Sequence, residues 1–443
     1  VDGTPTEADV YTNGAWRTML VGNLRNGGQG VYGIDITNPT NFSETNANQI
    51  YKWEFTDQDD PDLGFVQGNL TVAKVWTGAN QSEWAVIFGN GYNNSQADGY
   101  ASTTGKAALF ILLPGRFSGT WTLNQNYYKI VVGSGSTTTP NGLAAPYAID
   151  INGDYVIDYV YAGDLQGNMY KFNLTNTSPS SWTSSVLFTA SFATAGDQPI
   201  TAQPIVGAHP TGLQNGVIVY FGTGMYLQPT DNSTTNQVTQ SFYAIWDKLG
   251  TATTVAKSQL VQQQIYGAVS SGGSNFRLVS SNPINWSTTP SPQNLGWYFN
   301  LIENNASSNN GERVVSQPIL RNNNIIFSTL IPSANVCVPG GSSWLMEVNA
   351  ASGGSPTLSP FDVNKDGQFD TADYLSITIS GKTVTVAPSG VQSSVGMTGT
   401  PAVFLSPDKS TETKVLSGAQ GLGTVTENPG TGPAGRQNWR QLF

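Results

Sequence analysis

The chain is built from short stretches rich in Val, Ile, Tyr and Phe, each roughly five to eight residues long and bounded by Gly, Asn, Asp or Ser. Stretches of this length and composition predict β-strands joined by tight turns. No long segment shows the 3.6-residue apolar spacing of an amphipathic helix. The pattern therefore predicts an all-β chain.

The predicted strands recur in a fixed order. Each copy has a first strand that often contains Pro, an apolar strand that usually ends in Gly, and an aromatic strand that ends in a polar turn. In the third copy these features are Pro146, Gly163 and Tyr170. Six copies are recognised, and their first strands lie in the segments VDGTPTEADV, FVQGNLTVAKV, GLAAPYAIDINGD, ITAQPIVG, RVVSQPIL and MTGTPAVFL. The stretch from Phe276 to Leu301 could supply a further copy.

This recurrence favours a β-propeller. The copies are spaced roughly 50–110 residues apart, and each holds three or four short strands. A sheet of that size cannot bury either face alone, whereas sheets stacked around an axis cover both faces. We therefore predict a single domain, residues 1–443, folded as a modified β-propeller of about seven blades with long inserted loops. An array of β-sandwiches is the alternative, although it would show regular turns without a recurring order of strand types.

Composition narrows the possible partners. The 443 residues include 19 Lys and Arg against 29 Asp and Glu, a net charge of −10, and only 11% of residues are charged. Average domains are roughly 25% charged. The 38% of hydrophobic residues and the 49 glycines still allow a large core, which excludes a disordered chain. Because Lys and Arg are few and scattered, nucleic acids and anionic membranes are excluded as partners. No apolar run approaches the roughly 18–20 residues of a membrane span.

Catalytic motifs are scarce. His209, the single histidine, lies in the segment GAHPTG, which favours a loop residue over a catalytic base. The single cysteine, Cys337, has no partner for an intrachain disulfide. We therefore predict that the protein is not an enzyme. The alternative is a propeller enzyme, either a quinone-dependent dehydrogenase or a glycosidase, but the chain lacks adjacent cysteines and a repeated glycosidase-type turn.

The segment DINGDYVID, residues 150–158, has the oxygen-rich spacing of a cation site. Calcium takes six to eight oxygen ligands, and alternate side chains of a tight loop can converge on it. Tyr155 and Tyr161 stand where an EF-hand loop has its turn glycine and its final carboxylate, so the match is partial. An Asx-rich turn that caps its own backbone is the alternative. The predicted ligands are Asp150, Asn152, Asp154, the carbonyl of Val156, and Asp158.

A second loop, DVNKDGQFDTAD at residues 362–373, matches the twelve-residue calcium pattern more fully. Gly367 occupies the turn position, and Asp replaces the usual Glu at position 12. The alternative is a solvated acidic turn without metal. We expect one or two Ca²⁺ ions, and two of them would change the net charge from −10 to −6. The predicted ligands are Asp362, Asn364, Asp366, the carbonyl of Gln368, Asp370 and Asp373.

Several blocks occur in a distinctive order that covers most of the chain from Val1 to Phe443. They are VDGTPT, GVYGIDITNP, VIFGNGYN, IDINGDYVIDYVYAGDLQGNMYKFNL, GERVVSQPIL, TLIPSANVCVPGGSSWLMEVNAASGG, FDVNKDGQFDTAD and GRQNWRQLF. In this order they resemble the C-terminal region of the PilC/PilY-type proteins associated with the tips of bacterial type IV pili. The stretches around 176–192 and 228–294 contribute no such block.

The resemblance implies a modified seven-bladed propeller and a calcium loop on the DINGDYVID ligands. In that family, calcium in this loop is thought to switch between holding the pilus out and allowing its retraction. The resemblance also implies an extracellular location at the pilus tip and minor pilins as partners. We therefore predict a calcium-binding, non-enzymatic pilus-tip adhesin and biogenesis factor. It would regulate pilus extension, retraction and twitching motility, and attach the cell to surfaces or host cells.

Members of this family usually carry a large N-terminal region and further propeller sequence ahead of the VDGTPT block. We therefore expect this chain to be the C-terminal part of a longer protein, with a first blade that could lack one or more strands.

Overall fold

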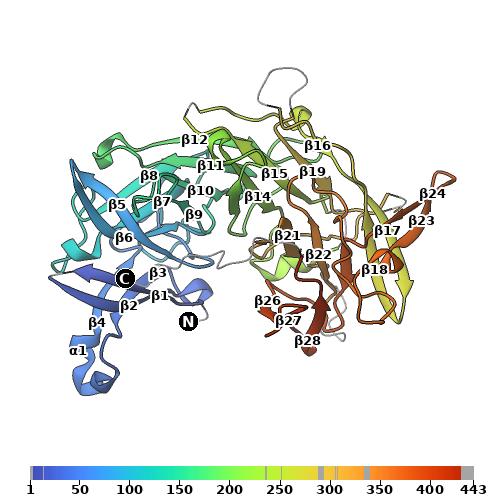
Figure 1. Cartoon of the computed structure of the whole chain (residues 1–443). Coiled ribbons are helices and arrows are strands. Elements are labelled where there is room, and N and C mark those ends of the chain that lie inside the picture. The colour runs from blue at the N-terminus through green and yellow to red at the C-terminus, as the bar shows by residue number, and fades with distance from the viewer. Residues whose placement is uncertain are drawn as a thin grey trace. The chain divides into compact units, whose positions relative to one another are not determined.

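The computed structural model describes residues 3–12, 14–234, 237–250, 252–287, 294–304, 306, 308–333 and 340–430 (Figure 1). Cys337 and the C-terminal GRQNWRQLF block lie outside these residues. The described chain is almost entirely strands and turns, and its one α-helix, α1 (Ala47–Ile50), has four residues. The prediction of an all-β chain is confirmed. The described residues divide into two compact units, one up to residue 187 and one from residue 188 to 430, which are described separately.

The first unit contains three four-stranded sheets in which neighbouring strands follow one another along the chain. The pairs from β1 to β4, from β5 to β8 and from β9 to β11 run antiparallel, as in the meanders from which propellers are built. The first sheet holds β1 (Thr6–Thr12), β2 (Ala15–Asn23), β3 (Gly30–Asp35) and β4 (Tyr51–Thr56). The second holds β5 (Thr71–Gly78), β6 (Gln81–Gly89), β7 (Ala107–Leu112) and β8 (Tyr127–Val132). The third holds β9 (Tyr147–Ile149), β10 (Tyr159–Gly163), β11 (Asn168–Asn173) and β12 (Thr183–Thr189).

Strand β7, AALFIL, shows why these sheets stack face to face. All six of its side chains are buried. Side chains alternate between the faces of a strand, so Phe110 packs in one core cluster with Phe55 and Phe88. Leu109 packs in a second cluster with Phe172. The middle sheet is therefore covered on both faces, which explains the continuous apolar run in its sequence.

The second unit contains two larger sheets, a three-stranded sheet and a hairpin. The fourth sheet has five strands, in the spatial order β13 (Ile205–Ala208), β14 (Val217–Gly222), β15 (Ser241–Asp247), β19 (Gly296–Asn300) and β16 (Val261–Gln262). The fifth sheet has six strands, in the spatial order β17 (Ile265–Ser271), β18 (Ser274–Val279), β25 (Gly390–Gln392), β22 (Trp344–Asn349), β21 (Asn324–Ser328) and β20 (Ile319–Arg321). The three-stranded sheet is β26 (Ala402–Leu405), β27 (Glu412–Gly418) and β28 (Gly421–Glu427), and the hairpin is β23 (Leu375–Ile379) with β24 (Lys382–Val386).

The first strands of the six predicted copies each lie at the edge of a different sheet; they are β1, β5, β9, β13, β20 and β26. The first sheet has four strands, as the second and third have. The further copy suggested for Phe276–Leu301 is wrong, because this stretch does not form a sheet of its own. Its strand β18 joins the fifth sheet, whereas its strand β19 joins the fourth. The long insertion thus adds strands to the edges of neighbouring sheets, where unpaired backbone groups are available.

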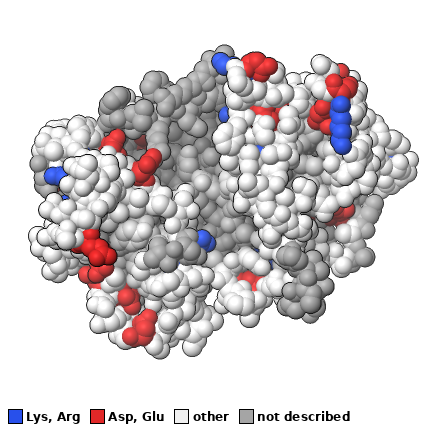
Figure 2. Space-filling view, turned by 90° about the horizontal axis from the view of Figure 1, so that it is seen from below, with Lys and Arg blue, Asp and Glu red and all other residues white. Residues whose placement is uncertain are grey.

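The surface keeps the low charge density expected from composition. On the face shown in Figure 2, acidic and basic side chains are sparse and separated by uncharged surface. None of the described helices is long and apolar enough to cross a membrane.

Candidate metal-binding loops

Loop 1, residues 150–158, connects β9 to β10 in the first unit. Its C-terminal end is fixed by the backbone. The Asp158 N–H donates to the carbonyl of Ile149 at 3.0 Å, and the Ile157 N–H donates to the carbonyl of Lys74 on β5 at 2.9 Å. The tip stays exposed, whereas Asp158 is only 4% exposed. The loop is therefore an exposed acidic tip on a base anchored to two sheets.

The polar side chains of loop 1 turn back onto the loop. Oδ2 of Asp150 accepts from the Tyr155 N–H at 2.7 Å. Oδ2 of Asp154 accepts from the Asn152 side-chain amide at 3.2 Å, and its Oδ1 accepts from the Val156 N–H at 2.9 Å. Oδ2 of Asp158 accepts from the N–H of Ile151 at 2.9 Å. The loop thus gathers the four oxygen-bearing side chains that its sequence predicted: Asp150, Asn152, Asp154 and Asp158.

The carboxylates of loop 1 lie close enough to repel one another. Burial raises the pKa of the Asp158 carboxyl, and the negative charges of Asp150 and Asp154 raise it further, against a backbone hydrogen bond that lowers it. Loop 1 therefore concentrates negative charge that a cation would offset.

Loop 2, residues 362–373, repeats the same bonds in the second unit. Oδ2 of Asp362 accepts from the Gly367 N–H at 2.9 Å. Asp366 accepts from the side-chain amide of Asn364 at 2.9 Å and from the N–H of Gln368 at 2.8 Å. The last carboxylate, Asp373, accepts from the N–H of the second loop residue, Val363, at 2.7 Å. Two loops of different sequence therefore share one network, linking positions 1 and 6, 3 and 5, 5 and 7, and 2 and the final Asp.

The two loops also share their backbone conformation. In loop 1, Gly153 and Tyr155 have φ of 81° and 66°. In loop 2, the equivalent residues Lys365 and Gly367 have φ of 63° and 81°. Positions 4 and 6 are thus left-handed in both loops, with glycine at one position and an ordinary residue at the other. Tyr155, which departs from the calcium pattern in the sequence, adopts the conformation that glycine has in loop 2.

The final residues of loop 2 also accept hydrogen bonds from the loop backbone. Asp370 accepts from the Ala372 N–H at 2.7 Å and so caps the short turn Thr371–Asp373. Asp373 is fully buried, and its second oxygen accepts from the Asp370 N–H at 3.1 Å. Within the described ranges, no three carboxylate, imidazole or thiol groups converge closely enough to hold a metal as they stand. A cation at either loop would therefore also need the Asn side chain and backbone carbonyls, which are oxygen donors that calcium accepts.

Two features of these loops could not be read from the sequence. The contact between loop 1 and Lys74 joins residues far apart in the chain. Loop 2 is likewise tied to a distant turn, because the Lys365 ammonium donates to the Gly272 carbonyl at 2.7 Å.

His209 follows β13 as the predicted loop residue, but it is only 2% exposed. Its ring stacks on Trp246 at 4.1 Å and meets Trp286 edge-on at 5.1 Å. Its Nδ1 lies 2.8 Å from the Thr211 hydroxyl. Burial lowers the pKa of His209, and the charge of Lys248 lowers it further. These surroundings are those of a packed aromatic residue.

Comparisons with known proteins agree on one family. The family model described as the PilY1 beta-propeller domain matches residues 1–270. The type IV pilus biogenesis factor PilY1 of Pseudomonas aeruginosa is 32% identical over 474 residues, covering 100% of this chain and 37% of that protein. A PilY1 homolog of Xylella fastidiosa is 32% identical over 373 residues, covering 80% of this chain and 23% of that protein.

A solved structure gives the same result. The crystal structure of the C-terminal domain of Pseudomonas aeruginosa PilY1 matches with a TM-score of 0.76 at 31% identity, covering 97% of this chain and 84% of that one. The similarity confirms the resemblance and the propeller class seen in the sequence. The chain spans 37% of the length of the Pseudomonas relative.

Proposed function

The chain belongs to the PilY1 β-propeller family, and we propose that it is a calcium-binding, non-enzymatic biogenesis factor and adhesin at the tip of the type IV pilus. In this proposal it regulates pilus extension and retraction, and with them twitching motility. Its partners are minor pilins and a ligand on a host cell or other surface. The relatives are named as pilus biogenesis factors, which supports this role over a propeller enzyme.

The calcium assignment rests on one observation. Loops 1 and 2 lie in different units and differ in sequence, yet they share four hydrogen bonds and two left-handed positions. A simple acidic turn has no reason to repeat all of these features. Their shared result is a set of carboxylate and amide side chains turned back onto a tight loop, and oxygens of these kinds are donors that calcium prefers.

A bound Ca²⁺ would neutralise carboxylates that otherwise repel one another. In loop 1 it would be held by Asp150, Asn152, Asp154, the Val156 carbonyl and Asp158. In loop 2 it would be held by Asp362, Asn364, Asp366, the Gln368 carbonyl, Asp370 and Asp373.

Each loop is placed to couple this neutralisation to the sheets. Loop 1 ends on β10 and contacts β5 through the Lys74 carbonyl. Loop 2 contacts the β17–β18 turn through Lys365, and the residue before it, Phe361, pairs with Glu427 on β28. A loop made rigid would hold two sheets of its unit in a fixed relation, which provides a route from calcium to a pilin-binding or ligand-binding surface.

The test replaces the chromosomal gene in the piliated bacterium with the full-length protein carrying Asp154→Asn, which removes one loop charge and keeps the side-chain shape. We expect fewer surface pili and less twitching than in wild type, with normal protein level. Glu44→Gln is the matched control, because Glu44 is exposed and lies outside both loops. Piliation and twitching equal to wild type in the Asp154→Asn strain would contradict the role of loop 1.

A further inference from the structure

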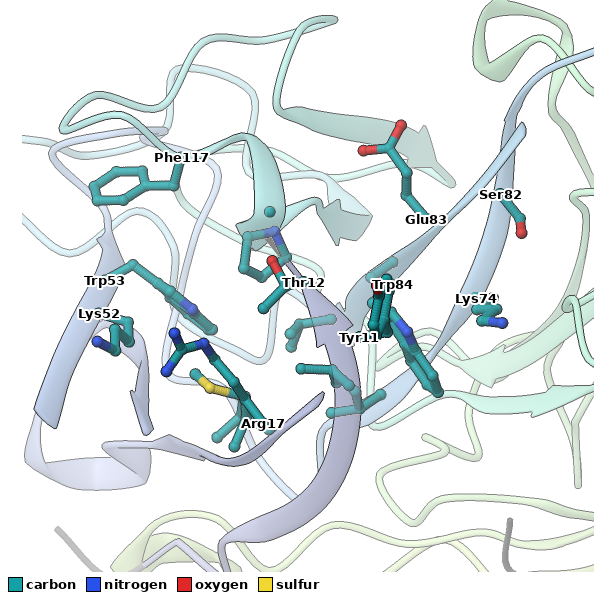
Figure 3. A pocket seen from close by; sticks show the side chains of 18 residues that line it. Tyr11, Thr12, Arg17, Lys52, Trp53, Lys74, Ser82, Glu83, Trp84 and Phe117 are labelled. Atoms are coloured by element: carbon teal, nitrogen blue, oxygen red, sulfur yellow. The ribbon is translucent and has the colours of Figure 1, made fainter. Parts of the chain in front are cut away.

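A cavity of about 500 Å³ lies in the first unit between the first two sheets (Figure 3). Strands β1, β2 and β4 line one side, and β5 and β6 line the other. Phe117, just after the short turn Pro114–Arg116, closes part of the wall. This volume falls within the roughly 300–1,000 Å³ of small-molecule sites.

Short side chains lie on the strands of both sheets that border the cavity. Val21 lies opposite Gly33 in the first sheet, and Val72 lies opposite Val86 in the second. The Trp53 ring lies over Gly33, which has no side chain to oppose it. Protein interiors are normally close-packed, so an open space of this size between two sheets is a feature to explain.

Basic side chains surround the cavity in excess. Arg17 and Lys52 share a single carboxylate, with their nitrogens 2.8 Å and 3.8 Å from the same oxygen of Asp35. Lys74 has no carboxylate within 4.0 Å in the described part of the chain, and its ammonium lies 5.3 Å from the centre of the Trp84 ring. Figure 3 shows Lys74 and Trp84 together on the second sheet.

The remaining acid at the cavity, Glu83, is already paired. Arg116 donates to its two oxygens at 3.1 Å and 2.9 Å. The charged lining residues are Arg17, Lys52, Lys74 and Glu83, and their ion-pair partners are Asp35 and Arg116. Together they carry four positive and two negative charges, a net +2 in a chain with a net charge of −10. This local excess favours an anionic ligand.

The cavity walls add aromatic rings and free donors. Tyr11, Trp84 and Phe117 line the space. The indole N–H groups of Trp84 and Trp53 are both buried without a hydrogen-bond partner among the described residues. Both N–H groups are closed off from solvent as they stand, so a ligand oxygen would reach them only with a shift of the ring. It would then relieve the roughly 1–3 kcal/mol that an unpaired buried donor costs. Thr12 and Ser82 also line the cavity.

We propose that this cavity binds a sugar ring that carries a carboxylate, such as a uronic acid unit of a surface polysaccharide. The ring carboxylate would be attracted by Lys74 and the Arg17–Lys52 pair, its hydroxyls would accept from the indole N–H groups, and its C–H faces would pack on the aromatic walls. An acidic peptide side chain would use the charges but leave the rings uncovered. The proposal does not rest on calcium binding.

The experiment titrates the full chain with methyl β-D-glucuronide and follows tryptophan fluorescence. Calcium is kept saturating throughout, because the Lys74 carbonyl contacts loop 1. We expect saturable binding with a Kd on the order of 1 mM. Methyl β-D-glucoside, which lacks the carboxylate, and benzoate, which lacks the hydroxyls, should each bind about tenfold more weakly. Equal binding of either control would overturn the assignment of an acidic sugar.

Two variants test the residues. Lys74→Gln removes the unpaired charge, and Trp84→Phe keeps an aromatic ring but removes its N–H. Each should weaken glucuronide binding by about tenfold, the effect of one charge-assisted or buried hydrogen bond. Lys382→Gln, at an exposed position of β24, should bind like wild type. Wild-type affinity in folded Lys74→Gln, or no saturable binding by wild type, would overturn the proposal even if Trp84→Phe fails to fold.

Discussion

Loops 1 and 2 lie in different compact units, which makes the calcium assignment open to a sharp test. A ligand that binds only the folded state stabilises it by about 2.7 kcal/mol when its concentration is 100 times its Kd. For units of about 190 and 250 residues, each kcal/mol raises the melting temperature by roughly 2–4 °C. Calcium at that excess should therefore raise the melting temperature of each unit by roughly 5–11 °C.

The most informative changes are Asp154→Asn and Asp366→Asn. Each carboxylate sits at position 5 of its loop, where it accepts from the Asn amide at position 3 and from the N–H at position 7. Asparagine keeps an oxygen to accept that N–H but removes the charge that a cation needs. Without calcium, the variants should therefore unfold within about 0.5 kcal/mol of wild type, as exposed substitutions usually do.

The assay is differential scanning calorimetry of the full chain with excess chelator and with excess calcium. Asp154→Asn should lose the calcium gain of the first unit and keep that of the second, and Asp366→Asn should do the reverse. Glu44→Gln, which changes an exposed charge outside both loops, should keep both gains.

The results that would refute this reasoning are specific. Identical profiles with chelator and with calcium would refute calcium binding at both loops. A full calcium gain in Asp154→Asn would refute the ligand set of loop 1 alone, and the same result in Asp366→Asn would refute that of loop 2.

Three further predictions concern stability. Lys414 is fully buried, with its ammonium 2.6 Å from Glu347 and in contact with Glu427. Lys414→Met should therefore lower the free energy of unfolding in urea by about 3–5 kcal/mol, whereas the exposed Lys382→Met should lower it by less than about 0.5 kcal/mol. A loss below about 1 kcal/mol would show that this ion pair is dispensable. Phe110→Ala, in the middle of the β7 core, should cost about 3–5 kcal/mol in the same assay, and a near-neutral result would contradict the packing of β7 on both faces. The pKa of His209 is lowered in the folded state, so the unfolded chain takes up a proton first as pH falls below about 6.5. The stability that neutral His209 contributes above that pH should be lost as the pH falls toward the pKa of His209 in the folded protein. This loss should be smaller in His209→Gln, and an equal loss in the variant would show that His209 is not its source.

Loops 1 and 2 show how much local sequence can predict. The oxygen spacing in DINGDYVID and DVNKDGQFDTAD lies within single turns, and the structure gathers Asp150, Asn152, Asp154 and Asp158, and Asp362, Asn364 and Asp366, within their own loops. What the residue pattern missed was that Tyr155 adopts a left-handed conformation. The surrounding hydrogen bonds impose that conformation, and the side chain itself does not signal it.

The cavity, in contrast, could not be predicted from local sequence. Most of its lining residues come from β1, β2, β4, β5 and β6, and in the sequence these have the pattern of ordinary strand residues. Lys74 and Arg17 become neighbours of one space only after two sheets stack. The small number of Lys and Arg residues excludes a broad basic surface. It does not exclude a local excess of positive charge.

The sequence by itself determined the strand type, the order of the six copies and the composition of the two acidic loops, because strand propensity, turn chemistry and ligand spacing act over a few neighbouring residues. Only the tertiary structure decided which edges the strands of the 276–301 insertion would join and which side chains would meet between sheets. Pairing and stacking depend on hydrogen-bond register and packing between segments far apart in the chain, and no local pattern specifies them.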